Sequence, residues 1–249
     1  MADPLVSVAM TCFNCANFLE EAIGSIAAQT WKNWELIIVD DRSVDNSPLV
    51  IKTLISKFGI NNKTKFIQHN KNLGYGGALK RAVEEGKGEL VAIVDGDDAL
   101  ASRQALSKMV KKHAEHPNAS LVYSNYWQCR DTLKKKKRGR CRALLEGETY
   151  LSSGTRCRIS HLKVFKRSAY KKTPGVNGQL LKSVDKDLVL KLEEVGDLVF
   201  FDELLYYYRK HPNNLCATFH KMPRKYKDKV NKMRKQSILD AHQRRKQKK

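Results

Sequence analysis

Three carboxylates stand within four residues directly after an apolar run, and they are the residues of this chain best suited to chemistry. Asp95, Asp97 and Asp98 follow Leu90–Val94. Like charges this close raise one another's pKa values, and a buried carboxylate is costly unless it is paired or binds a metal ion. Oxygen ligands with room left for waters and phosphate oxygens suit Mg²⁺ or Mn²⁺. Taken alone, this spacing is a weak signal that favours a solvated acidic turn after a strand, so the rest of the chain must decide.

The first hundred residues alternate between apolar runs and segments of helical periodicity. Buried strands are predicted at about 5–10, 35–39, 65–68 and 90–94, and helices at about 18–29, 47–58 and 73–85. This order predicts an α/β fold with a mostly parallel sheet that helices cover on both faces. Such sheets bind ligands at the carboxyl ends of their strands. We therefore expect Thr11–Asn14, Asp40–Asp41 and the acidic turn at 95–98 to share one crevice.

The second half of the chain is less regular. Helices are predicted near 102–116 and 185–195, and strands near 120–126 and 198–201. The run Lys134–Arg140 is densely cationic, and mutual repulsion favours a mobile loop there. From Lys221 onward the sequence is polar and basic, with a thin apolar stripe at Tyr226, Val230 and Met233. This pattern predicts a partly helical appendage.

The net charge of +21 is placed unevenly. Residues 1–130 carry 15 Lys/Arg and 14 Asp/Glu, whereas residues 131–249 carry 32 and 12. The basic half is expected to attract an anionic surface or ligand through a field that salt screens. No apolar run approaches the roughly 18 residues of a membrane span, and the start of the chain lacks the pattern of a signal peptide. We therefore expect a cytoplasmic protein, peripheral at the inner face of a membrane if the basic half binds lipid.

The cysteines are too dispersed for the disulfide framework of a small secreted domain, and reduced thiols are the expectation. They are Cys12, Cys15, Cys129, Cys141, Cys157 and Cys216. Cys12 and Cys15 stand between a strand and a helix with the spacing of a thioredoxin redox turn. The Cys-Gly-Pro-Cys sequence is absent, however, and the strand opens the chain. The favoured interpretation is two small residues in a loop.

Several segments, in order and spacing, resemble a family-two glycosyltransferase of the GT-A fold. They are residues 7–14, 29–43, 72–89, 164–168, 185–192 and 208–211, and the resemblance covers roughly residues 5 to 218. It implies a Rossmann-like, mostly parallel sheet with helices on both faces. The expected organisation is a transferase domain at 1–218, with a sugar-donor half at about 1–100 and an acceptor half at about 101–218, followed by a basic tail at 219–249.

The resemblance also implies roles for individual residues. The family transfers a sugar from a nucleotide diphosphate sugar, generally with inversion at the anomeric carbon. The donor nucleotide is expected at Thr11, Asn14, Asp41, Lys80 and Asp95. Arg209 and His211 match an element that closes over the diphosphate, to which a guanidinium offers two parallel donors. Mg²⁺ or Mn²⁺ is expected at Asp97, Asp98 and His211, where it would neutralise charge on the departing diphosphate.

Inversion requires a general base that removes the proton of the acceptor hydroxyl. Asp185 occupies the aspartate position of the family's Glu-Asp pair, although Val184 stands where the family has the glutamate. Asp187 is the fallback, and the two side chains would point about 200° apart on a regular helix. Either carboxylate could instead stabilise a helix N-terminus through the macrodipole. With the resemblance, Asp185 is the favoured base.

These features predict a metal-assisted, inverting transferase in surface glycan or glycolipid synthesis. Its acceptor would be a glycan or a lipid-linked sugar, and the basic half would bind an anionic membrane or an anionic acceptor. The alternative is a basic nucleic-acid-binding protein with a non-catalytic transferase-like core. That alternative ranks lower, because the tail lacks interleaved stacking aromatics and no zinc-finger or RNA-recognition signature is present. A solubilising, disordered tail also fits the composition.

Overall fold

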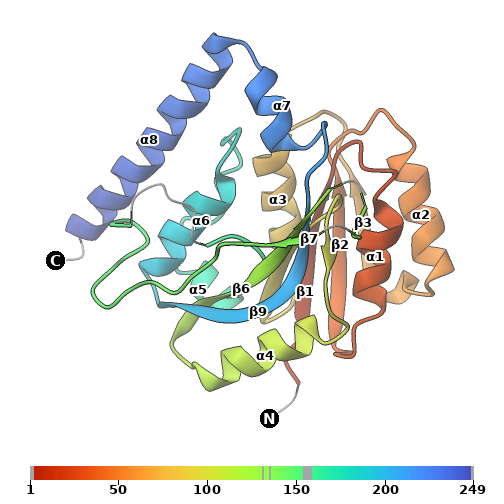
Figure 1. The fold of residues 1–249 in the computed structure, drawn as a ribbon, viewed down its shortest axis with the longest axis horizontal. Helices are drawn as coiled ribbons and strands as arrows, with labels where there is room; N and C mark the ends of the chain where they lie inside the picture. The colour runs from red at the N-terminus through yellow and green to blue at the C-terminus, as the bar shows by residue number, and fades with distance from the viewer. Residues whose placement is uncertain (1–2, 131, 135, 154–158, 248–249) are drawn as a thin grey trace.

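The computed structural model describes residues 3–130, 132–134, 136–153 and 159–247 of the 249-residue chain. Its strands join into one sheet (Figure 1). Their bounds are β1 Val6–Cys12, β2 Trp34–Asp40, β3 Thr64–Gln68, β4 Leu90–Asp95, β5 Ala99–Leu100, β6 Ala119–Cys129, β7 Lys136–Arg138, β8 Lys163–Lys166 and β9 Asp197–Arg209. The order across the sheet is β3-β2-β1-β4-β8-β6-β9-β5, and β7 pairs with β6.

Helices cover both faces of this sheet. Their bounds are α1 Leu19–Ala27, α2 Ser47–Lys57, α3 Gly74–Glu85, α4 Ala105–Glu115, α5 Arg167–Tyr170, α6 Val184–Glu193, α7 Leu215–Lys221 and α8 Arg224–Lys246, with a 3₁₀ turn at Asn61–Lys63. Apolar residues of α1, α2 and α4 pack on one face, and those of α3, α5 and α6 pack on the other. The predicted α/β architecture is therefore confirmed.

The first four strands follow directly from their apolar runs. Strand β1 is buried along its whole length, and β4 is buried up to its last residue. A strand that is covered on both faces needs an apolar residue at nearly every position. Strands β1, β2, β3 and β4 are mutually parallel. Because parallel strands end at the same edge, Thr11, Asp40 and Asp95 lie together at that edge.

The second half of the sheet departs from the sequence prediction at several strands. The short strands β5 and β8 were not predicted, and β9 and β7 differ from what was predicted. Strand β9 is a long strand parallel to β6, whereas only its first part was expected. Part of the run expected as a mobile loop forms β7, which pairs with the end of β6. Two local contacts offset the repulsion between its cations: Lys136 donates to the Tyr207 hydroxyl at 2.8 Å, and Arg138 pairs with Asp202. Lys135 lies outside the described residues.

The basic tail folds back on the domain as a helix. Helix α8 packs beside α6 (Figure 1), and Val230, Ser237 and Ala241 are its buried residues. Two ion pairs join it to the end of α6, Arg244 with Glu194 at 2.8 Å and Arg245 with Glu193 at 2.5 Å. None of the described helices is both long and apolar enough to cross a membrane.

Candidate functional site

The acidic turn after β4 meets the end of β9. The Asp97 carboxylate lies 2.9 Å from Nε2 of His211, although 114 residues separate the two in the chain. The Asp97 side chain is 27% exposed, and the imidazole packs on the ring of Phe18 with 4.5 Å between centroids. One carboxylate oxygen and one imidazole nitrogen therefore face each other at the edge of the crevice.

Asp98 has a different environment from Asp97. It is 1% exposed, and both of its carboxylate oxygens already accept hydrogen bonds, from the Arg209 backbone N–H at 2.7 Å and from the Tyr206 hydroxyl at 2.9 Å. Burial first, and then the charges of Asp97 and Asp95, raise the pKa of Asp98 well above its ordinary value. Asp98 thus ties the acidic turn to β9.

Arg209 stabilises the same turn from the other side. Its Nε donates to the carbonyl of Asp97 at 2.7 Å, and its guanidinium pairs with Glu21 and lies over the ring of Phe18. Arg209 is 1% exposed. The guanidinium that was expected to bind a diphosphate is therefore engaged with the protein, and His211 is the residue of that pair that faces Asp97.

Asp95 lies at the centre of the acidic group. Its Oδ1 accepts from the Thr11 hydroxyl at 3.1 Å, and its backbone N–H donates to the Tyr206 hydroxyl. Burial and the charge of Asp97 raise the pKa of Asp95 to about 7, with a smaller contribution from Asp185. Burial and the charges of Asp95 and Asp185 likewise raise the pKa of Tyr75. The charge of Asp185 on α6 therefore reaches both Asp95 at the end of β4 and Tyr75 on α3.

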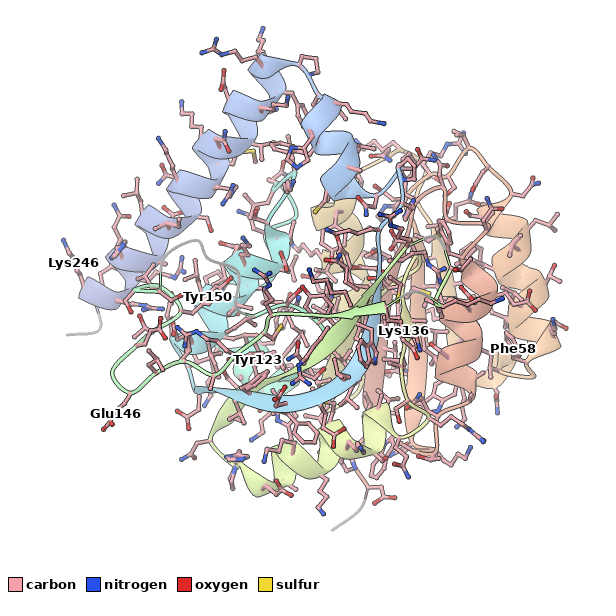
Figure 2. The ribbon with its side chains drawn as sticks, viewed as in Figure 1. Phe58, Tyr123, Lys136, Glu146, Tyr150 and Lys246 are labelled. Carbon is pink, nitrogen blue, oxygen red and sulfur yellow. A yellow bond between two sulfur atoms is a disulfide. The ribbon has the colours of Figure 1, made fainter. Side chains whose placement is uncertain are left out.

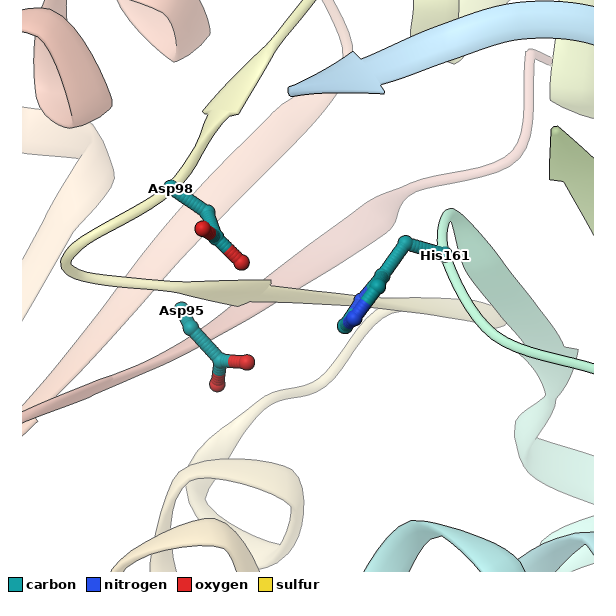
Figure 3. Close-up of side chains that lie close together, drawn as sticks. All are labelled: Asp95, Asp98 and His161. Carbon is teal, nitrogen blue, oxygen red and sulfur yellow. The ribbon is translucent and has the colours of Figure 1, made fainter. Parts of the chain in front are cut away.

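His161 is a functional-site residue that the sequence analysis missed. Figure 3 shows its imidazole pointing toward Asp95 and Asp98, and one ligand atom from each of the three lies within 4.8 Å of the others. The ring is stacked against Tyr206 and Tyr208, with centroid distances of 4.6 and 5.1 Å. Burial, followed by the charge of Lys163, lowers the pKa of His161 to about 3. The imidazole is therefore neutral and can offer a nitrogen lone pair.

Asp185 opens α6 on the far side of this crevice. Its Oδ2 lies 3.3 Å from Nζ of Lys163, which also donates to the carbonyl of Ser160. Burial raises the pKa of Asp185, but the charges of Lys163 and Lys186 oppose burial, and the pKa is lowered overall. The side chain is 27% exposed. Asp185 is thus an ionised carboxylate with access to the crevice.

Asp187, the fallback base, faces the protein interior. It is 4% exposed, lies 2.6 Å from Nζ of Lys191 and accepts a hydrogen bond from Ser237 of α8. The two carboxylates of α6 therefore point in different directions, as the helical geometry predicts. Asp187 holds α8 against α6 and does not face the crevice.

Asp41 and Asn14 shape the loops at the ends of β1 and β2. Oδ1 of Asp41 accepts from the Leu73 backbone N–H at 2.8 Å and lies 2.8 Å from Nδ1 of His69. None of the described residues donates to Oδ2 of Asp41. The side chain of Asn14 accepts from the Val44 backbone N–H. Lys80 lies apart from these loops, on the exposed side of α3, with its Nζ 3.8 Å from Glu84.

Cys12 and Cys15 form a disulfide at the end of β1, which corrects the expectation of two reduced thiols. Both residues are buried, and Sγ of Cys15 lies against Gly96 of the acidic turn. The spacing of the two cysteines was the only signal for this pairing. Cys129 and Cys216 are free thiols in the part of the chain that the structure describes, and Cys157 lies outside the described residues.

The residues present fit a divalent cation. Asp97 and His211 offer an oxygen and a nitrogen 2.9 Å apart, and Asp95, Asp98 and His161 form a second such group beside them. Imidazole and carboxylate ligands suit Mn²⁺, and carboxylates suit Mg²⁺. Burial, followed by repulsion from Asp97, raises the pKa values of Asp95 and Asp98, and a cation would relieve that repulsion.

Comparison with known proteins gives consistent matches. The profile of the family Glycosyl transferase family 2 matches residues 7–173. Chondroitin synthase of Pasteurella multocida is 28% identical over 211 residues, which is 85% of this chain and 21% of that protein. The fold is similar to that of S. aureus TarS in complex with UDP, with a TM-score of 0.68, 18% identity and coverage of 86% of this chain and 62% of that one.

A further structural match is the mannosyltransferase PcManGT of Pyrobaculum calidifontis in complex with GDP-Man and Mn²⁺. Its TM-score is 0.67 at 17% identity, with coverage of 88% of this chain and 61% of that one. The predicted GT-A fold is therefore confirmed. The chain spans less than two thirds of the length of each of these relatives.

Proposed function

The chain belongs to glycosyl transferase family 2, and on that premise we propose that it transfers a sugar from a nucleotide diphosphate sugar to a hydroxyl of a glycan acceptor. The observation that carries the proposal is the convergence of acidic side chains from distant parts of the chain. The charges of Asp97 and Asp185 both act on Asp95, and Asp97 faces His211. A solvated acidic turn would not require this arrangement.

The transfer is an inverting displacement with Asp185 as general base. The ionised carboxylate accepts the proton of the acceptor hydroxyl as its oxygen bonds to the anomeric carbon, and the nucleoside diphosphate departs from the opposite face. Lys163 keeps the carboxylate ionised at neutral pH. Asp97 and His211, with Asp98 or His161 as further ligands, would hold a divalent cation, which would neutralise charge on the diphosphate.

The sugar donor lies along the ends of β1, β2 and β4. Oδ2 of Asp41 accepts from an N–H of the nucleotide base, and Asn14 holds the loop that covers it. Asp95 contacts sugar or ribose hydroxyls, for which its raised pKa and its bond to Thr11 suit it. TarS in complex with UDP and PcManGT in complex with GDP-Man support a nucleotide sugar as the donor class.

A thermal-shift screen tests the proposal. UDP-, GDP- and dTDP-sugars are added with and without Mn²⁺, because a ligand that binds only the folded state raises its melting temperature. One donor is expected to stabilise the protein in a manner that requires Mn²⁺ or Mg²⁺. NMR of the product of that donor with an oligosaccharide acceptor then reads the anomeric configuration, and a retained configuration would contradict Asp185 as base.

The transferase is also proposed to work at an anionic membrane surface, as a peripheral protein. Helix α8 supports this, because six of its cations are exposed: Arg224, Lys225, Lys229, Lys232, Lys235 and Lys246. Each such cation contributes about 1 kcal/mol near an anionic bilayer. Sedimentation with anionic and neutral liposomes checks this part, since equal partitioning that is insensitive to salt would remove it. Tight, salt-sensitive filter retention of nucleic acid without sugar transfer would favour the alternative function instead.

A further inference from the structure

A large open cavity lies beside the candidate active site, between the ends of β6, β7 and β9 and helix α7. Its volume is about 770 Å³, which lies within the range of small-molecule binding sites. Four cations from three separate segments line it, Arg130, Lys136, Lys137 and Lys210, together with His220. Lys136, on β7, is labelled in Figure 2. No aspartate or glutamate is among the described residues that line the cavity.

Three of these cations have charged groups without a partner among the residues that the structure describes. Lys136 donates to the Tyr207 hydroxyl, but Arg130, Lys137 and Lys210 make no side-chain hydrogen bond or ion pair with any described residue. By contrast, the neighbouring cations Arg244 and Arg245 pair with Glu194 and Glu193. Like charges gathered around one cavity repel one another. An anionic ligand would relieve that repulsion.

The cavity adjoins the candidate active site. It lies on the side away from the loops at the ends of β1 and β2, which contain Asn14 and Asp41. His211, which faces Asp97, lines both, and Tyr208 lines the cavity while it stacks on His161. Asp41 follows β2, whereas the cavity lies at β6 and β9, and β1, β4 and β8 separate the two in the sheet. A sugar donor that extends from Asp41 to Asp97 therefore leaves this cavity to the other substrate.

We propose that the cavity binds the acceptor, and that the acceptor is an anionic glycan whose carboxylate or phosphate groups contact Arg130, Lys137 and Lys210. This inference rests on the proposed function and adds the acceptor class to it. Bidentate Arg contacts and Lys point charges are both suited to such anions. The anionic groups fix the chain of sugars so that its terminal hydroxyl faces Asp185.

The proposal is tested by measuring acceptor binding in the absence of turnover. A failure of the acceptor proposal can then be distinguished from a failure of the proposed transfer reaction. Calorimetry in the presence of UDP and Mn²⁺ measures the affinity for two matched pairs of probes. The first pair is a hyaluronan octasaccharide and the same octasaccharide with its carboxyl groups reduced to alcohols. The second pair is maltooctaose with and without phosphate esters. The anionic form of at least one pair is expected to bind about tenfold or more tightly than its neutral partner. The two pairs distinguish a carboxylate acceptor from a phosphate acceptor.

A matched pair of variants locates the binding. The double variant Lys137→Gln/Lys210→Gln is expected to lose about tenfold or more of the affinity for the anionic probe. The control Lys52→Gln/Lys111→Gln removes the same charge from exposed positions on α2 and α4 and should retain the affinity. Equal losses in both variants, or no binding of either anionic probe to the unsubstituted protein, overturn the proposal. The affinity of Lys137→Gln/Lys210→Gln for UDP with Mn²⁺ is measured as well. If it falls as much as the affinity for the glycan, the cavity belongs to the sugar donor and the proposal is overturned.

Discussion

Nζ of Lys163 lies 3.3 Å from Oδ2 of Asp185, and this contact joins a buried strand to the first turn of α6. Lys163 is 3% exposed, so its ammonium is desolvated and depends on this carboxylate and on the Ser160 carbonyl. Asp185 in turn keeps a pKa below its ordinary value despite its burial. The pair therefore positions an ionised carboxylate at the crevice.

Replacement of that carboxylate tests its role as base. Asp185→Asn is expected to lower the rate of sugar transfer about 100- to 10,000-fold, because the amide cannot accept the hydroxyl proton. Binding of the sugar donor should persist, since Asp41 and Asp97 are unchanged. Single-turnover transfer and donor-dependent thermal shifts measure the two effects separately. Full transfer by the variant would exclude Asp185 as the base.

Removal of the Lys163 ammonium beside Asp185 should change the pH profile of kcat/KM. The charge of Lys163 lowers the pKa of Asp185, so Lys163→Met raises it. A general base acts only when it is deprotonated, and the acidic limb of kcat/KM is therefore expected to move to higher pH. Lys166→Met is the control, because Lys166 lies on the same strand but bonds to the carbonyl of Pro117. An identical shift in both variants would show that Lys163 does not act on the base.

Asp187 should affect stability and not the chemical step. In Asp187→Asn the buried ammonium of Lys191 loses its ionised partner, which is expected to cost about 3 kcal/mol or more of unfolding free energy. Denaturant unfolding measures the loss. The double variant Asp187→Asn/Lys191→Met should recover part of it, because no unpaired charge then remains buried. A variant as stable as the parent would show that the pair contributes little.

The regular part of the fold was predictable because its apolar and periodic sequence patterns extend over many residues. Strands β1, β2 and β4 are apolar along nearly their whole length, and helices α1 and α3 bury every third or fourth residue. Strands β5 and β8 and helix α5 have two to four residues each, too few for a periodic pattern. Strand β7 was missed for another reason, since charge repulsion was weighed without the hydrogen bonds that β6 offers.

The site was predictable only where a residue belongs to a longer pattern. Asp97 and His211 were expected together, and the structure brings them within 2.9 Å. A single polar residue in or just before a short strand carries no such pattern, so His161 and Lys163 were missed. A signal for Lys163 did exist, because it shares one face of β8 with the fully buried Phe165. A lysine on a buried face requires an acidic partner.

The two neighbouring aspartates of the acidic turn should respond differently to substitution. Asp97→Ala is expected to abolish stabilisation by Mn²⁺ with the nucleotide sugar while the free protein melts normally, because Asp97 is partly exposed beside His211. Asp98→Asn should lower the melting temperature of the free protein, since Asp98 accepts bonds from Arg209 and Tyr206 in a buried position. Differential scanning fluorimetry with and without the ligands measures both. Metal-dependent stabilisation that survives in Asp97→Ala would place the cation at Asp95, Asp98 and His161 instead.

His113 provides a pH dependence of stability that is independent of the active site. Its Nε2 bonds to the carbonyl of Val164, its Nδ1 has no partner in the described structure, and burial lowers its pKa from 6.5 to about 4. The unfolded chain therefore binds a proton below about pH 6.5 that the folded chain binds only near pH 4. This contribution to stability is complete above pH 6.5 and is lost as the pH falls toward 4, by about 3 kcal/mol in total. Urea unfolding across this range should show a shallower decline in His113→Gln, and parallel curves for the two proteins would rule out a buried neutral imidazole.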